Sequence, residues 1–312
     1  MKAVVIGGAG FIGSNLSERL LVEDHEVFCI DNFSLGNDNN IKAIHDNTNF
    51  HLIRMDVTDT KALIECFKNI DPGYVFHLAA NSDIQASASD PQVEYRNTYS
   101  TTFSVLAAMR ATSIKNLFFA STSAVYGDKR GEILDEKTPN LMPISYYGAA
   151  KLGSEALISA FTYMNEMNSL IFRFPNVIGP HLTHGVIFDF IERLSKDRSY
   201  LRILGDGNQT KPYIYVCDLI DAILKFMVSP KGITLYNVGV SGATSVRRIA
   251  DIVCEEMGLK DVEYDFTGGE SGWKGDVPRF TYNTDKINEA GWTAKYDSDE
   301  AVRMTIRGLV EK

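Results

Sequence analysis

The stretch Ala3-Val4-Val5-Ile6-Gly7-Gly8-Ala9-Gly10-Phe11-Ile12-Gly13 decides the fold. Its first four residues are apolar and mostly β-branched, as in a buried strand, and residues 15–21 have the apolar spacing of a helix. Glycines between a strand and a helix allow a tight turn, a close approach to a pyrophosphate and close helix–strand packing. The stretch predicts the first β-turn-α of a dinucleotide-binding sheet. Its predicted cofactor residues are Gly7, Gly10, Phe11, Ile12 and Gly13.

An acidic residue in the right place strengthens this interpretation. The next apolar run, residues 26–30, ends in Asp31, 18 positions after Gly13. A carboxylate about 20 residues beyond the glycines is typical of a group that binds the adenosine ribose. The glycines alone would also fit an ordinary tight turn. A carboxylate here repels a 2′-phosphate, and Asn32 follows it with no arginine close by in sequence, so we predict NAD and not NADP.

Composition sets further limits. The chain has 312 residues, 45% of them hydrophobic, and a net charge of −9, which argues against nucleic acid as a partner. Its four cysteines are widely spaced, which fits free thiols and neither a disulfide framework nor a metal site. The chain runs straight into its first strand and has no apolar stretch of membrane-spanning length. We expect a cytoplasmic protein that binds no metal and no membrane.

Strand-like runs alternate with helical patterns over the first 175 residues. This alternation predicts an α/β fold, with a Rossmann-type doubly wound parallel sheet. Beyond Gly179 the regularity fades, but no linker separates the two halves, which predicts a smaller C-terminal α+β lobe. We expect residues 1–175, rejoined by residues 213–240, to bind NAD, and residues 176–312 mainly to bind substrate.

The strongest chemical signal is the sequence Tyr147-Gly148-Ala149-Ala150-Lys151. Residues at i and i+4 lie on one face of a helix, so the lysine is within reach of the tyrosine. A nearby ammonium favours phenolate, which predicts a lowered tyrosine pKa suited to general-base work. In isolation, such a pair would fit a tyrosine packed by chance over a surface lysine. Here the pair follows a predicted dinucleotide-binding sheet in the sequence, so we predict that the tyrosine and the lysine are catalytic.

Together these motifs resemble the extended short-chain dehydrogenase/reductases, specifically the nucleotide-sugar epimerases and dehydratases. Among them the chain is most similar to the UDP-glucose 4-epimerases. The resemblance covers nearly the whole chain and rests on the glycine loop, Asp31-Asn32 and six further motifs: 76–80, 121–127, 147–151, 176–180, 204–207 and 275–279.

The resemblance implies roles for individual residues. Thr122 would hydrogen-bond the sugar 4-hydroxyl, Tyr147 would remove its proton, and Lys151 would hold the nicotinamide ribose. The further cofactor contacts that it implies are Asn32, Asp56, Val57, Leu78, Ala79, Ala80, Ser82, Asn97, Ser121, Tyr147 and Pro175. A nucleotide-diphosphate sugar is the implied substrate, with Thr122, Ser123, Asn176, Lys211 and Arg279 at its site. His77 fits a hydrogen-bonded core residue better than an acid or base.

Missing residues narrow the reaction. Similar dehydratases carry Asp-Glu where this chain has Ser123 and Ala124, neither of which can act as the extra acid or base. The prediction is an NAD-dependent 4-epimerase of the UDP-glucose/UDP-galactose type. Alternatives are a 4-dehydrogenase that releases a 4-keto sugar, or an epimerase of UDP-glucuronate, UDP-GlcNAc or a GDP-sugar. A catalytically silent NAD-binding regulator is a third possibility. The resemblance also implies a homodimer through residues 92–112 and the helix that bears Tyr147.

Overall fold

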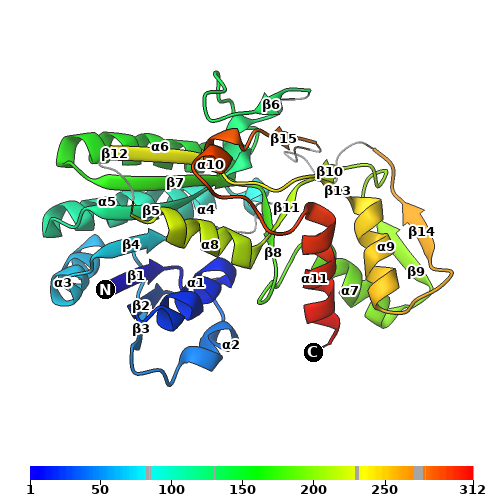
Figure 1. The fold of residues 1–312 in the computed structure, drawn as a ribbon, viewed down its shortest axis with the longest axis horizontal. Coiled ribbons are helices and arrows are strands. Elements are labelled where there is room, and N and C mark those ends of the chain that lie inside the picture. Colours follow the sequence, from blue (N-terminus) through cyan, green and yellow to red (C-terminus); the bar gives the residue numbers. More distant parts are fainter. Residues whose placement is uncertain are drawn as a thin grey trace. The chain divides into compact units, whose positions relative to one another are not determined.

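The computed structural model describes residues 1–81, 84, 86–129, 131–228, 232–269, 277 and 279–311. The chain divides into two compact units, shown with their elements in Figure 1. Unit 1 comprises Met1–Gly127, Leu141–Arg173 and Ile223–Tyr236. Unit 2 comprises Asp128–Asn140, Phe174–Ala222 and Asn237–Lys312.

Unit 1 is built on a seven-stranded sheet with the order β12-β7-β5-β4-β1-β2-β3. The pairs from β3 across to β5 are parallel. Sequence order reverses between β1 and β4, which is the switch point where ligands bind to such sheets. This topology confirms the predicted Rossmann-type fold. The strands are β1 (Lys2–Ile6), β2 (Glu26–Asp31), β3 (Phe50–Arg54), β4 (Tyr74–His77), β5 (Asn116–Thr122), β7 (Asn168–Phe174) and β12 (Gly232–Asn237).

Helices cover this sheet because its strands are apolar on both faces. Alternate strand residues such as Val4, Val75 and Phe119 pack with residues of α3, α5 and α6 in one core cluster. The intervening residues, such as Val5 and Cys29, point to the opposite face and are also buried. The helical elements of unit 1 are α1 (Phe11–Val22), α2 (Asp38–Ile41), η1 (Lys42–Ile44), α3 (Thr60–Ile70), η2 (Ala86–Ser89), α4 (Gln92–Glu94), η3 (Tyr95–Ser100), α5 (Thr101–Thr112), η4 (Ser123–Tyr126) and α6 (Tyr146–Asn165).

The segment over residues 92–112 is helical but is not one regular α-helix. The segment begins as α-helix in α4, widens to a π-helix in η3, and returns to α-helix in α5. A π-helical turn inserts extra backbone into the ladder of hydrogen bonds and is frequent at functional sites.

Unit 2 contains short two-stranded sheets and amphipathic helices. Its helices are α7 (Val186–Lys196), α9 (Val246–Glu256), α10 (Asp285–Glu289) and α11 (Ser298–Val310), while α8 (Val216–Phe226) begins in unit 2 and ends in unit 1. Its strands are β6 (Ile133–Leu134), β8 (Asn176–Ile178), β9 (Tyr200–Ile203), β10 (Thr210–Lys211), β11 (Tyr213–Tyr215), β13 (Thr244–Ser245), β14 (Glu263–Phe266) and β15 (Thr281–Tyr282).

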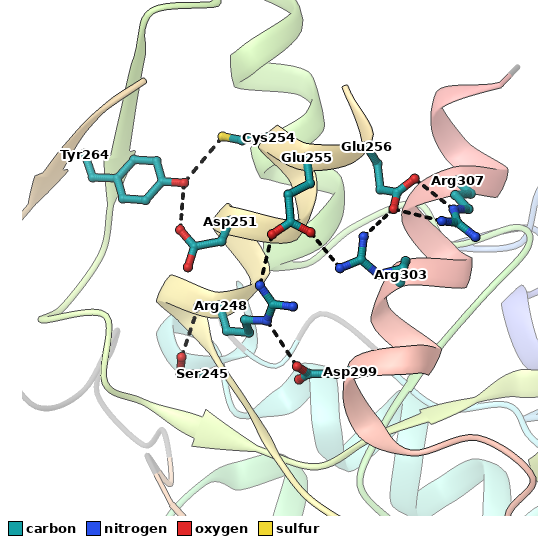
Figure 2. A network of polar contacts seen from close by, with 10 residues as sticks. All are labelled: Ser245, Arg248, Asp251, Cys254, Glu255, Glu256, Tyr264, Asp299, Arg303 and Arg307. Carbon is teal, nitrogen blue, oxygen red and sulfur yellow. Dashed lines mark hydrogen bonds and ion pairs between the residues drawn. The ribbon is translucent and has the colours of Figure 1, made fainter. Parts of the chain in front are cut away.

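Ion pairs link α9 to α11, as Figure 2 shows. Arg303 of α11 bonds Glu255 at 2.6 Å and Glu256 at 2.5 Å, and Arg307 bonds Glu256 at 2.8 Å. Arg248 of α9 contacts both Glu255 and Asp299 at 3.1 Å. We call these six side chains the α9–α11 network. Its arginine side chains are between 30% and 57% exposed.

Within the described ranges, no helix has the length and apolar character needed to cross a membrane. The same residues contain no group of three or more His, Cys, Asp or Glu side chains placed to hold a metal ion.

Candidate active site

The glycine loop between β1 and α1 requires its glycines for two separate reasons. Gly7 has a φ of +79°, and a Cβ there would lie 2.7 Å from the backbone nitrogen of Ala79. A Cβ on Gly13 would lie 2.1 Å from the carbonyl oxygen of Gly7. The first contact brings the loop against the end of β4, and the second lets α1 begin directly beside the turn.

The start of α1 fits a phosphate group. Gly10 is the N-cap and has no side chain to bond the free N–H groups of the first turn. An uncapped helix end beside a glycine turn offers several donors and the positive end of the helix dipole to an anion. The predicted contacts Phe11 and Ile12 are the first two residues of α1, so their N–H groups belong to this first turn.

Asp31 ends β2 and closes the same loop. Its carboxylate accepts hydrogen bonds from the backbone N–H groups of Ala9 at 3.0 Å and Phe33 at 2.8 Å. Burial raises the pKa of Asp31, while these two hydrogen bonds and the charge of Arg54 oppose that rise. The carboxylate is thus tied to the turn that would receive a cofactor, as a ribose-binding group requires.

The structure brings an arginine near Asp31, although none is close to it in sequence. Arg54 pairs with Asp31 in the register of β2 and β3, so it is distant in sequence and adjacent in space. Its guanidinium bonds Asp38 at 2.5 Å and lies 3.8 Å from the centroid of the Phe33 ring. Because Arg54 already has an acidic partner, the carboxylate of Asp31 stays the dominant charge at the strand end.

Most of the other predicted cofactor residues of unit 1 that the structure describes lie at or beside strand ends, while Lys151 lies in α6. Asn97 lies in η3, and Ser82 lies outside the described residues. Asn32 directly follows β2 and its side chain bonds Asp56, whose carboxylate also accepts from the N–H and hydroxyl groups of Thr58. The remaining residues at these ends are Val57 after β3, Leu78, Ala79 and Ala80 after β4, and Ser121 within β5.

The three predicted catalytic residues lie together in unit 1. Thr122 ends β5 and forms a side-chain hydrogen bond with Tyr147, which lies in the first turn of α6. Lys151 follows one turn later, with its Nζ 5.8 Å from the centroid of the Tyr147 ring. Ser145 caps this helix by accepting from the N–H of Gly148 at 3.1 Å, which fixes where α6 starts and hence where Tyr147 lies.

The pKa of Tyr147 is raised in this structure, contrary to the predicted lowering. Burial raises the pKa of Tyr147 well above its ordinary value, and the negative charge of Glu94 adds to the rise. The hydrogen bond with Thr122 acts in the opposite direction. The sequence spacing predicted the nearby ammonium of Lys151. It did not predict the burial of the phenol or the nearby carboxylate of Glu94, and these two effects dominate the pKa of Tyr147.

Lys151 is a buried lysine, only 2% exposed. Its Nζ donates a 2.7 Å hydrogen bond to the carbonyl oxygen of Ala120 and lies 4.6 Å from the centroid of the Phe119 ring. Burial lowers the pKa of Lys151 to about 8, while the charges of Glu94 and Glu155 oppose that fall. The ammonium is therefore directed at the end of β5 and held there by two carboxylates.

A buried ion pair supports this arrangement. Arg173 of β7 makes a bidentate contact with Glu155 of α6, at 3.0 Å from Nε and 2.6 Å from Nη2. The hydroxyl of Ser121 donates to the same carboxylate at 2.5 Å. Burial works against the charge of Arg173, but the hydrogen bond and charge of Glu155 outweigh it and raise the pKa of the guanidinium. Glu155 of α6 is thus bonded to both β5 and β7, the strands next to the catalytic residues.

His77 is buried in β4, as predicted, but its hydrogen bonding is incomplete. Its Nε2 lies 3.0 Å from the hydroxyl of Thr102, and its Nδ1 has no hydrogen-bond partner. Burial lowers the pKa of His77 to about 3, and the nearby charge of Lys151 adds to the fall. The imidazole is neutral at physiological pH, which suits a core residue better than an acid.

The predicted substrate residues outside unit 1 all belong to unit 2. Asn176 begins β8, and Pro175, a predicted cofactor contact, lies directly before it. Lys211 ends β10, and Arg279 forms a backbone bridge with the neighbouring Thr210. These two cations therefore lie on adjacent segments. Residues 270–276 and 278, which hold most of the 275–279 motif, lie outside the described residues.

Four charged or polar residues near the catalytic group were not predicted from the sequence. They are Glu94, Thr98, Glu155 and Arg173. Glu155 lies four residues after Lys151, so the same helical spacing that pairs Tyr147 with Lys151 could have found it. For Glu94 and Thr98 the sequence carries no comparable signal, because their position depends on the π-helical turn.

A doubly wound sheet with a phosphate-binding turn, a carboxylate after its second strand and a tyrosine–lysine pair defines the class of the short-chain dehydrogenase/reductases. Residues 3–239 match the NAD dependent epimerase/dehydratase family, and the chain belongs to this family. The predicted family and the predicted cofactor NAD are thereby confirmed.

Individual relatives agree with this membership. UDP-arabinose 4-epimerase 1 of Arabidopsis thaliana is 31% identical, over 94% of this chain and 75% of its own. A Thermus thermophilus UDP-glucose 4-epimerase solved with NAD is 30% identical, with a TM-score of 0.87 over 98% of both chains. A Thermotoga maritima UDP-glucose 4-epimerase solved with UDP-glucose is 28% identical, with a TM-score of 0.90 over 100% of this chain and 99% of its own.

Proposed function

We propose that this protein is an NAD-dependent nucleotide-sugar 4-epimerase of the UDP-glucose/UDP-galactose type. The observation that carries the proposal is the hydrogen-bonded pair of Thr122 and Tyr147, with buried Lys151 one helical turn away. The family membership supplies the cofactor, and the names of similar proteins support the reaction. Ser123 and Ala124 after the catalytic threonine leave no extra acid or base for dehydration.

In this mechanism each catalytic residue has one task. The hydroxyl of Thr122 bonds the oxygen on the sugar C4 and holds it against Tyr147. Tyr147 takes the proton from that oxygen as C4 is oxidised and gives it back after the keto-sugar has turned over. Lys151 holds the cofactor ribose and favours the phenolate by its charge. Bound NAD supplies the hydride acceptor and later the hydride donor at C4.

The cofactor roles of the strand-end residues follow from their placement. We assign the pyrophosphate to the glycine loop and the start of α1, and the adenosine ribose to Asp31. Asp56, Val57, Leu78, Ala79, Ala80, Asn97, Ser121 and Pro175 complete the proposed cofactor contacts, together with Ser82, which lies outside the described residues. Asn176, Lys211 and Arg279 are the proposed substrate contacts of unit 2.

Product analysis of the purified protein tests the proposal. With NAD present, we expect it to convert UDP-galactose to UDP-glucose, and the Tyr147→Phe variant to lose at least about 100-fold in kcat. UDP-arabinose belongs in the same assay, because the Arabidopsis relative is named for that sugar. No 4-epimer from UDP-galactose, UDP-arabinose, UDP-GlcNAc, UDP-glucuronate or a GDP-sugar would refute the proposal. Build-up of a 4-keto sugar would indicate a dehydrogenase instead.

We also propose that the protein is a homodimer through α5 and α6. These helices expose large apolar side chains: Phe103 is 49% exposed, Met164 76% and Tyr163 86%. Exposed apolar residues gathered on neighbouring helices are typical of a surface that another chain covers. Light scattering should give twice the mass of the chain, and a monomeric mass would contradict the proposal. Replacing Phe103 and Met164 with Asp should produce monomers.

A further inference from the structure

Glu94 is a buried carboxylate that the proposed mechanism does not use. It ends α4, just before the π-helical turn, and is 1% exposed. Glutamate is almost never fully buried unless it is paired, because removing its charge from water is costly. A buried carboxylate beside a catalytic group therefore requires a physical explanation.

Both carboxylate oxygens of Glu94 accept hydrogen bonds. The side-chain amide of Asn81 donates to Oε1 at 2.7 Å, and the hydroxyl of Thr98 donates to Oε2 at 2.7 Å. The backbone N–H of Asn81 donates to that same hydroxyl at 3.2 Å, so the hydroxyl proton is left to point at Glu94. Two donors that converge on one carboxylate stabilise its charged form.

The charge of Glu94 acts on two catalytic residues together. It raises the pKa of Tyr147, in addition to the effect of burial, and it opposes the fall that burial causes in the pKa of Lys151. Glu155 also acts on Lys151, but the guanidinium of Arg173 already neutralises it in a bidentate pair. Of the two carboxylates that act on Lys151 among the described residues, Glu94 is thus the one that hydrogen-bonds neutral groups and no arginine.

Among the described residues, few other titratable groups lie on the elements that pack most closely against α4. These elements are η2, η3 and α6. No titratable side chain belongs to η2, while η3 carries Tyr95, Arg96 and Tyr99, and α6 contributes Tyr147, Lys151 and Glu155. Tyr95 is 60% exposed, and the Arg96 side chain is 72% exposed and lies 4.0 Å from Asp56. His77 of β4 is the remaining neighbour that interacts with Lys151.

We propose that Glu94 is a positioning residue whose buried charge holds the proton on Lys151 and the proton on the Tyr147 phenol. The charge of Glu94 acts upward on the pKa of Tyr147 and on the pKa of Lys151, so it helps to set the pH range in which the two residues work. The inference rests on the proposed roles of Tyr147 and Lys151, and it assigns Glu94 an electrostatic role in addition to theirs.

A lysine titration tests this inference without relying on catalysis. The full chain is labelled with ¹³C at Cε of its lysines and titrated by NMR with NAD present. The Lys151 signal is identified because it is lost in Lys151→Met. In Glu94→Gln we expect the titration midpoint of Lys151 to move down by about one pH unit, because the isosteric amide removes the charge. An unchanged midpoint in a folded Glu94→Gln protein overturns the proposal.

Two further variants keep the test decisive. Glu65→Gln is the matched control: it removes an exposed carboxylate that pairs with Lys68 at 2.7 Å, and should leave the Lys151 midpoint in place. If Glu94→Gln does not fold, Glu94→Asp withdraws the charge by one methylene and should shift the midpoint down by a smaller amount. No shift in Glu94→Asp overturns the proposal in that case.

Activity measurements then separate the two proposals. In Glu94→Gln both limbs of the pH–rate profile for epimerisation should move to lower pH, because Tyr147 and Lys151 each lose a proton more readily. A purely structural role would lower the rate without moving the limbs. A shifted Lys151 midpoint in a protein that makes no epimer would sink the proposed function and leave the role of Glu94 intact. An active epimerase in which Glu94→Gln leaves the Lys151 midpoint unshifted would support the proposed function and overturn the role of Glu94.

Discussion

Each unit of this protein contains a group of interlocked charges, and the two groups differ mainly in exposure. In unit 1, Lys151, Glu94, Glu155 and Arg173 are all at most 7% exposed. In unit 2, the α9–α11 network joins three arginines to three carboxylates at the surface (Figure 2). The Arg173–Glu155 pair of unit 1 and the arginine–carboxylate pairs of unit 2 have similar donor–acceptor distances. The comparison teaches that burial, more than contact geometry, decides what a charge can do.

Burial gives the charges of unit 1 their chemical effect. In the weakly screened interior one carboxylate can hold a proton on a lysine and on a tyrosine, as Glu94 does with Lys151 and Tyr147. At the surface of α9 and α11, water and salt screen the same interaction, so Arg303 and Arg307 mainly tie two helices together. Shifting the protonation of a catalytic residue requires the buried environment of unit 1, whereas joining two helices is possible at the exposed surface of unit 2.

The largest effect we expect comes from breaking the buried pair. Arg173→Met leaves Glu155 as an uncompensated buried charge, which should lower the free energy of unfolding by about 3–5 kcal/mol in urea denaturation. Adding Glu155→Leu removes that charge and should recover most of the loss. A cost below about 1 kcal/mol for Arg173→Met would show that the buried and exposed groups do not differ as argued.

A smaller effect should appear in the pH dependence of stability. The pKa of His77 falls from its ordinary 6.5 to about 3 on folding, so between these values the unfolded chain binds a proton that the folded protein does not. Stability must therefore fall as pH falls through this window, by about 2 kcal/mol between pH 8 and pH 5 from this residue. Urea denaturation across pH should show the loss in the wild type, and His77→Gln should lack that part of it.

The surface carboxylates of unit 2 provide the contrast. Hydrogen bonds from arginines lower the pKa of Glu255 and Glu256, so their stabilising effect is present at neutral pH and is lost as pH falls below about 4.5. If His77→Gln and the wild type lose stability equally between pH 8 and pH 5, the distinct pH window assigned to unit 1 is wrong.

The smallest effect should come from the α9–α11 network. Arg303→Met removes contacts with both Glu255 and Glu256, yet we expect a loss of less than about 1 kcal/mol. The difference between variant and wild type should shrink further as NaCl is raised, since salt screens exposed charges. A loss above about 2 kcal/mol that is insensitive to salt would place this network with the buried group instead.

The sequence predicted the features that depend on neighbours along the chain. The strand–glycine–helix stretch predicted the fold because it forms one continuous unit, and the spacing of Tyr147 and Lys151 predicted their meeting because a helix repeats every 3.6 residues. The amphipathic helices α7 and α11 were not predicted, because the regular alternation of strands and helices fades beyond Gly179.

The features that the sequence missed depend on neighbours in space. Arg54 reaches the end of β2 through strand register, and Glu94 reaches the catalytic pair through the packing of α4 on α6. The direction of the tyrosine pKa was wrong for the same reason, since burial belongs to the folded protein and not to a spacing. Local pattern thus identified the catalytic residues, while their protonation depends on long-range packing.

The π-helical turn η3 also affects how this chain aligns with others. Each residue of an α-helix turns about 100° around the axis, so one additional residue absorbed in a wide turn rotates everything before it by that amount relative to α5. A relative whose helix is regular throughout would need a one-residue gap here before Glu94 is matched to its spatial equivalent. An ungapped alignment would pair Glu94 with a residue that faces a different direction. The alignment position of Glu94 would then not show whether relatives have a carboxylate at the equivalent place in the fold.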